Sequence, residues 1–212
     1  MGLDNRQTGN FITIFDGKFS QKVPAGTQGS KARVNKLGNT VNEMFYDRFT
    51  GKLINIKTQD GTYGKSWIFS FKDNAEVYHL QLSYSNGFAT QFIKMLPNVN
   101  LSQEMTVQPQ VKEVDGKVKS SIFINQNGQS IKHAYTRDNP NGLPPMVQIT
   151  VKGNQVWDDT DQLAFLHAML VSDIIPKLEG FNGETHHVDA MEVAPEQQTP
   201  VGAGMDPNDI PF

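Results

Sequence analysis

The chain has 212 residues, with 22 acidic and 19 basic side chains, a net charge of −3 and no cysteine. Without cysteine it has no disulfide framework, no thiolate metal site and no cysteine nucleophile. No stretch approaches the roughly 18 apolar residues of a membrane span, and the first residues lack the apolar core of a signal peptide, so we expect a cytoplasmic protein without membrane contact.

The first part of the chain contains several short segments rich in β-branched and aromatic side chains, bounded by turn residues. Such segments are typical of β-strands. They lie at 11–15, 52–58, 65–71 and 77–82. Residues 20–50, between the first two, show no clear period, so we predict a long irregular loop that could close over a bound strand.

A second group of predicted strands follows at about 105–114, 118–124, 131–137 and 146–152. Asp115-Gly116 and Asn127-Gly128 separate the first three as tight hairpin turns do. Strands at short intervals with glycine-rich punctuation favour an antiparallel sandwich or barrel over alternating strands and helices.

Two helices interrupt this pattern. Residues 89–96 place apolar side chains on one helical face, ahead of Pro97. A second helix is predicted to begin at Asp159, which has capping-box spacing to Gln162, and to end before Pro176. Its apolar stripe is better explained by packing on a sheet than by a partner groove. The stripe consists of Leu163, Leu166, Leu170 and Ile174, widened by Phe165 and Met169.

The charge is unevenly distributed along the chain. Residues 182–212 hold six of the 22 acidic residues and none of the 19 basic ones, so residues 1–181 carry 16 acidic and 19 basic side chains, a net charge of +3. The acidic part is rich in proline, glycine and glutamine and offers little to pack, which is typical of a disordered tail. We therefore predict one domain at 1–181 followed by a flexible acidic arm that could compete for a basic groove.

The arm ends in a sequence suited to capture by a partner protein. An aromatic ring next to an α-carboxylate, preceded by acidic residues and a rigid Ile-Pro step, offers an apolar plug and anions at fixed spacing. The residues are Asp206, Asp209, Ile210, Pro211 and Phe212.

The run Asp209-Ile210-Pro211-Phe212 resembles the acidic tip of single-stranded DNA-binding proteins of bacteria and many phages. The resemblance covers about eight residues, and this tip is less acidic than the usual one. It implies an OB-fold-like antiparallel barrel with one or two helices, of the phage type, in a bacterial or phage-infected cytoplasm. It also implies binding of single-stranded DNA in replication, recombination or repair, recruitment of other replication proteins through the tip, and a possible homo-oligomer.

Binding of single strands without sequence preference needs cations for phosphates and exposed rings for bases. In 65–71, Lys65, Trp67, Phe69 and Phe71 share one side, and Trp67 is the best stacking candidate, although such rings are more often core. In 118–124, Phe123 lies on the polar side with Lys119. The candidate DNA-binding residues are Lys31, Arg33, Lys36, Tyr46, Arg48, Lys65, Trp67, Lys119, Phe123, Lys132, Tyr135 and Arg137.

Other functions have weaker support. His186-His187 with Asp189 and Glu192 could bind a metal ion, but they lie in the predicted flexible arm. The glycine-rich 26–31 lacks the spacing of a phosphate-binding loop. We therefore expect no catalysis, cofactor or metal ion. The main alternative is a phage structural or assembly protein with a solubilising tail, and a metal-assisted nuclease is a more distant one.

Overall fold

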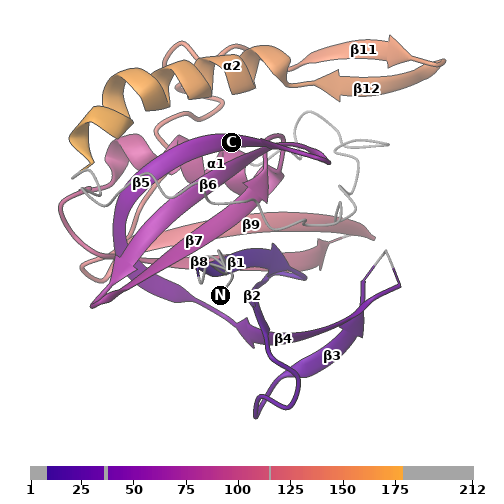
Figure 1. Cartoon of the computed structure of the whole chain (residues 1–212). Helices are drawn as coiled ribbons and strands as arrows, with labels where there is room; N and C mark the ends of the chain where they lie inside the picture. Colours follow the sequence, from indigo (N-terminus) through magenta and orange to yellow (C-terminus); the bar gives the residue numbers. More distant parts are fainter. Residues whose placement is uncertain (1–8, 36–37, 115, 179–212) are drawn as a thin grey trace.

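The computed structural model describes residues 9–35, 38–114 and 116–178, which form a mainly β structure with two helices (Figure 1). Lys36, the acidic arm and its tip lie outside the described residues. The strands are β1 (Asn10–Phe15), β2 (Lys18–Val23), β3 (Lys31–Val34), β4 (Thr40–Tyr46), β5 (Phe49–Gly61), β6 (Gly64–Asp73), β7 (Glu76–Ser83), β8 (Met105–Val114), β9 (Lys117–Gln126), β10 (Gln129–Ser130), β11 (Val147–Val151) and β12 (Asn154–Asp158).

The helices are α1 (Gly87–Met95) and α2 (Thr160–Met169). A 3-10 turn, Leu96–Asn98, follows α1. The helical path of α2 continues through a π-helical segment, Leu170–Ile174, and a 3-10 turn, Ile175–Lys177. In the described residues no helix combines the length and the apolar character that crossing a membrane requires.

Ten strands form one sheet in the order β10-β9-β8-β5-β6-β7-β1-β2-β4-β3, and β11 and β12 form a separate hairpin. All neighbours in the large sheet are antiparallel except β1 and β7, which are parallel. The long strand β5 pairs with β8 through Phe49–Gly51 and with β6 from Lys52 onward. A bulge at Ile54 inserts one residue, which bends the strand so that it can serve both partners.

The core lies between the inner side of the sheet and the two helices, α1 and α2. Phe92 of α1 meets Phe69 and Phe71 of β6 with ring centroids 5.0 and 6.1 Å apart, in edge-to-face geometry. All three rings are fully buried. Burying such aromatic side chains stabilises the fold by several kcal/mol in total, at about 1.5–3 kcal/mol for each. The alternation in β6 therefore reflects packing against a helix.

Helix α1 also explains why the described strands do not close into a barrel. Gln91 of α1 donates its amide to the carbonyl of Ser120 at 2.9 Å and accepts from the backbone of Ile122 at 3.3 Å. These bonds satisfy backbone groups of β9 that a further strand would otherwise take. The strand order ends at β10 and β3, which do not pair with each other, so the expected closed antiparallel barrel is not found in the described residues, although the mainly β class with two helices is confirmed.

The prediction of a loop over 20–50 was wrong. These residues form β2, β3 and β4, two successive antiparallel pairs that extend the sheet beyond β1. The strands were missed because many of their side chains are polar and half-exposed, so the apolar period of two is weak. The prediction of a strand over 131–137 was also wrong, since β10 ends after two residues and the chain then turns onto α1 through Ala134, whose N–H bonds to Lys94.

Both predicted helices are present, but the predicted capping box of α2 is not. Asp159 makes no side-chain capping bond. Asp158 takes that role, because its carboxylate accepts from the backbone N–H of Thr160 at 3.0 Å and from its hydroxyl. Gln162 is buried and donates to the carbonyl of Pro144 at 2.8 Å, so it ties α2 to the preceding loop.

Candidate nucleic-acid interface

The two-stranded antiparallel pair β8–β9 has one buried side and one side turned to solvent. Its register pairs Val107 with Ile124 and Gln108 with Phe123. Val107 and Ile124 are fully buried, whereas Phe123 is 41% exposed. Alternation therefore places ten residues on the outer side, none of which is buried. We call this side the ribbon face; it comprises Thr106, Gln108, Gln110, Lys112, Val114, Lys117, Lys119, Ser121, Phe123 and Asn125.

All charged side chains of the ribbon face are basic. The face carries three lysines, five amide or hydroxyl side chains, a valine and an exposed ring, and none of its ten residues is a carboxylate. Lys112 and Lys119 are cross-strand partners, so the register places two cations next to each other on this face. The face therefore favours a polyanion whose flat groups can stack on Phe123.

Arg48 lies at the edge of this face. The hydroxyl oxygens of Thr50 and Thr106 are 2.8 Å apart across β5 and β8, so both side chains lie on the outer side. The register pairs Phe49 with Val107, and extending it by one residue places Arg48 beside Gln108. Arg48, Gln108 and Phe123 thus form one row across three neighbouring segments, with an exposed cation at one end and an exposed ring at the other.

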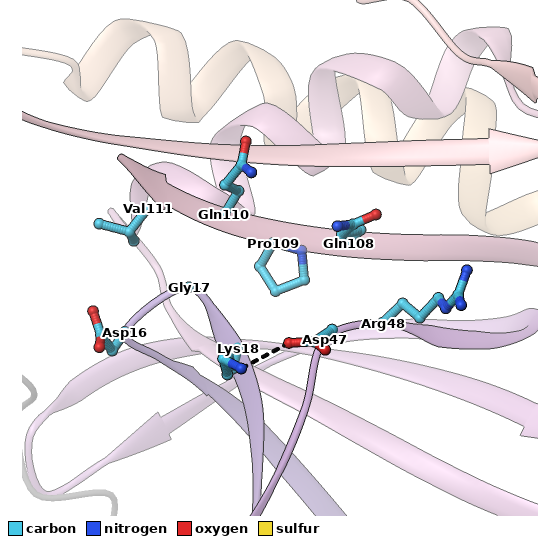
Figure 2. Close-up of a pocket in the computed structure, with 9 residues that line it drawn as sticks. All are labelled: Asp16, Gly17, Lys18, Asp47, Arg48, Gln108, Pro109, Gln110 and Val111. Atoms are coloured by element: carbon cyan, nitrogen blue, oxygen red, sulfur yellow. Dashed lines mark ion pairs between the residues drawn. The ribbon is translucent and has the colours of Figure 1, made fainter. Parts of the chain in front are cut away.

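A groove of about 480 Å³ opens where β8 leaves β5 (Figure 2). Its walls are β8, the β1–β2 turn and the β4–β5 turn. Gly17 in the first turn has φ +70°, and a Cβ there would lie 2.6 Å from the backbone nitrogen of Val111, so only glycine permits this approach. The lining residues are Asp16, Gly17, Lys18, Asp47, Arg48, Gln108, Pro109, Gln110 and Val111.

The groove itself is electrostatically balanced. Lys18 and Asp47 form an exposed ion pair with 2.8 Å between Nζ and Oδ1. The hydrogen bond and the charge of Lys18 lower the pKa of Asp47, and the same contact raises the pKa of Lys18. With Asp16 and Arg48 the groove holds two acids and two bases. The positive character of this region therefore comes from the neighbouring ribbon face, and the groove supplies polar groups and shape.

Of the candidate residues proposed from the sequence, the fold brings Arg48, Lys119 and Phe123 together on this surface. Lys65 and Trp67 lie elsewhere, and Trp67 corrects the prediction. The indole is 1% exposed, stacks on Tyr84 with centroids 4.8 Å apart, and donates from Nε1 to the Tyr84 carbonyl at 3.1 Å. Lys65 lies over the Tyr84 ring at 4.8 Å. The Tyr84 ring contacts both the Trp67 indole and Lys65, and the indole is buried by contacts within the protein. Trp67 is therefore a core residue and not a stacking platform for bases.

Lys31 and Arg33 lie on β3, at the far end of the strand order from β9. Arg33 makes a two-bond ion pair with the buried Glu43, at 2.8 and 2.9 Å, and its guanidinium lies 4.4 Å from the centroid of Phe15. These contacts hold the outer hairpin together. Tyr46 is exposed, and its hydroxyl donates to Gln21 at 3.4 Å.

The predicted group Lys132, Tyr135 and Arg137 follows β10. Lys132 and Arg137 are exposed, but Tyr135 is 7% exposed and packs edge-on against Phe165 of α2, with centroids 5.7 Å apart. Burial raises the pKa of its hydroxyl. Tyr135 is therefore a core ring, and the two cations beside it have no exposed aromatic partner from this group.

Sequence reasoning missed Gln108, Gln110 and Lys112. A signal was present, because in 105–112 apolar residues occupy the odd positions and polar residues the even ones. Pairing that polar side with the polar side of 118–124 would have identified the ribbon face.

Within 9–35, 38–114 and 116–178 no group of three histidine or acidic side chains is arranged to hold a metal ion. The histidine pair at 186–187 lies outside those ranges. Comparisons with protein families, with curated proteins and with solved structures gave no match.

Proposed function

We propose that the protein binds single-stranded DNA without strong sequence preference, through the ribbon face and Arg48. The observation that carries this proposal is that Lys112, Lys119 and the exposed ring of Phe123 share one face that has no carboxylates. Cations follow a phosphate backbone whatever its sequence, and every base offers a π-face to a ring. The amides of Gln108 and Gln110 can add hydrogen bonds to sugar, phosphate or base edges.

The connectivity of the central strands supports the same proposal. β5, β6 and β7 form an antiparallel meander, α1 follows, and the hairpin β8–β9 returns to pair with β5. This order resembles that of the OB-fold, whose strands and connecting loops bind oligonucleotides. The chain would be a variant in which α1 and β1 occupy the places where the ring would close.

The proposed role includes recruitment of other proteins of replication, recombination or repair. It rests on the resemblance of Asp209-Ile210-Pro211-Phe212 to the tips of single-stranded DNA-binding proteins. A variant ending at Pro211 should bind DNA normally, because no cation or ring of the ribbon face changes. Beads carrying DNA saturated with either form would be used to capture replication proteins from a bacterial lysate. Equal capture by both forms, or none by either, would remove recruitment from the proposal.

DNA binding is tested by titrating fluorescent oligo-dT and a duplex of equal length with the full chain. If Arg48, Lys112, Lys117 and Lys119 each contact a phosphate, affinity for the single strand should fall about 50-fold between 50 and 200 mM salt, from a slope of roughly −0.7 per contact. Duplex should bind more weakly, because its stacked bases cannot reach Phe123. Absent binding, or equal binding to both DNAs, would overturn the proposal and favour the alternative of a structural or assembly protein.

A further inference from the structure

The hairpin β11–β12 extends from the start of α2 away from the main sheet (Figure 1). Its base is held in place by the bond from Gln162 to the Pro144 carbonyl and by the bonds of Asp158 to Thr160. At its tip, Lys152 and Gly153 have φ of 50° and 84°, as a tight two-residue hairpin turn requires. The hairpin is thus well anchored at one end and projects into solvent at the other.

The two sides of this hairpin differ in their side-chain hydrogen bonding and in their exposed apolar surface. On one side Thr150 accepts a hydrogen bond from Gln155 at 2.9 Å. The other side carries β-branched residues that are largely exposed: Val147 at 48%, Ile149 at 38% and Val151 at 44%, with Val156 opposite Ile149. A two-stranded hairpin is at best marginally stable in water unless an apolar face is covered. This side, which we call the hairpin face, therefore has the composition of a contact surface.

We propose that the hairpin face binds the hairpin face of a second copy of this chain across a two-fold axis. The register makes the face complementary to itself. Ile149–Val156 is the middle of five cross-strand pairs, so an axis along that pair sets Ile149 against Ile149 and Val147 against Val151 of the other copy. The apolar residues then meet only apolar residues at the centre of the contact.

Charge complementarity supports a second copy as the occupant. The same rotation sets the tip of each hairpin against the base of the other. The tip carries Lys152, whereas the base carries Asp158 and the exposed Asp161 of the first turn of α2. Each dimer would therefore bring a cation to a cluster of acids at both ends of the contact.

The contact is small. Five residues span about 17 Å of strand, and the exposed part of the face amounts to roughly 300 Å² per copy, well below the about 800 Å² per partner of a standard interface. We therefore expect a reversible dimer with a dissociation constant in the micromolar range. The hairpin face does not overlap with the ribbon face, which lies on other strands.

Sedimentation velocity of the full chain between about 1 and 200 µM tests the dimer. Ile149→Lys places a charge at the axis and should raise the dissociation constant at least tenfold, with an unchanged unfolding midpoint. Gln148→Lys adds the same charge on the opposite side of the same strand and should leave the dimer intact. A wild-type chain that stays monomeric throughout, or equal effects of the two variants, would overturn the proposal.

The geometry can be tested separately because the chain has no cysteine. Ile149→Cys should be crosslinked to a dimer by a short bismaleimide reagent, since sheets packed face to face would place the backbones at the two introduced thiols about 10 Å apart. Gln148→Cys, on the opposite side, should crosslink much more slowly. Similar rates for the two variants would contradict the two-fold arrangement even if a dimer exists.

Discussion

Two aromatic residues on strands of one sheet, Trp67 on β6 and Phe123 on β9, have opposite environments. Trp67 is 1% exposed and stacks on Tyr84, whereas Phe123 is 41% exposed beside polar side chains. In both strands successive side chains point to opposite sides of the sheet, so the strand pattern alone does not distinguish the two rings. The difference arises from the helices: α1 and α2 cover the side that carries Trp67, and α1 bonds to β9 from the side opposite Phe123. An exposed ring is therefore informative about binding only once the covered side is known.

The largest expected effect concerns stability. Trp67→Ala removes a fully buried ring and its hydrogen bond to Tyr84, and should lower the free energy of unfolding by about 3–5 kcal/mol. Phe123→Ala should change it by less than about 1 kcal/mol, because the ring is already half in water. Urea unfolding followed by circular dichroism measures the free energy of unfolding of both variants. Similar losses for the two variants would erase the distinction between the two rings.

A smaller effect is expected for the cations that share the ribbon face with Phe123. Replacing both Lys112 and Lys119 by Gln should reduce the slope of log affinity against log salt by about 1.4, from roughly 0.7 for each phosphate contact. Replacing both Lys72 and Lys177, two exposed lysines outside the ribbon face, by Gln removes the same charge and serves as the matched control. The measurement is a titration of oligo-dT at four salt concentrations. An equal reduction by the control would show that overall charge, and not this face, controls binding.

The smallest expected effect concerns a buried cation on the side of the sheet that the helices cover. Lys94 of α1 is 4% exposed, with its Nζ 3.4 Å from Oε1 of Gln162. Burial lowers its pKa from 10.5, while the charge of Asp159 raises it. Lys94→Met should therefore stabilise the fold by about 1 kcal/mol at pH 7, since the cost of burying the cation disappears.

The pH dependence of the stability follows from the direction in which the pKa of Lys94 is shifted. Below the lowered pKa the Lys94 side chain is protonated in both the folded and the unfolded chain, so the burial cost is present in full. As the pH rises through the lowered pKa towards 10.5, the folded state releases its proton first and the wild type gains stability. The advantage of Lys94→Met should shrink over this range in thermal unfolding. A variant less stable than wild type at pH 7 would mean that the ammonium group is well solvated or paired.

How much of this could be predicted from the sequence depends on how strongly each segment alternates. In 118–124 the polar and apolar sides are distinct, so the outward position of Phe123 and Lys119 was predictable and is confirmed. In 65–71 the shared side of Trp67 and Phe69 was also correct, but a sequence does not reveal that helices cover that side. Residues 20–50 failed because polar strands at the end of a sheet carry little periodic signal, and the groove at Gly17 depends on a contact with β8 almost 100 residues away.

The central claim is that an exposed ring on the ribbon face stacks on the bases of single-stranded DNA. The most direct measurement is the affinity of Phe123→Ala for oligo-dT, with Phe123→Trp as the restoring variant and Val118→Ala, on the opposite side of β9, as the control. We predict that Phe123→Ala loses about 1–3 kcal/mol of binding free energy with unchanged stability, and that Phe123→Trp and Val118→Ala bind at least as well as wild type. Unchanged affinity of Phe123→Ala would contradict the account.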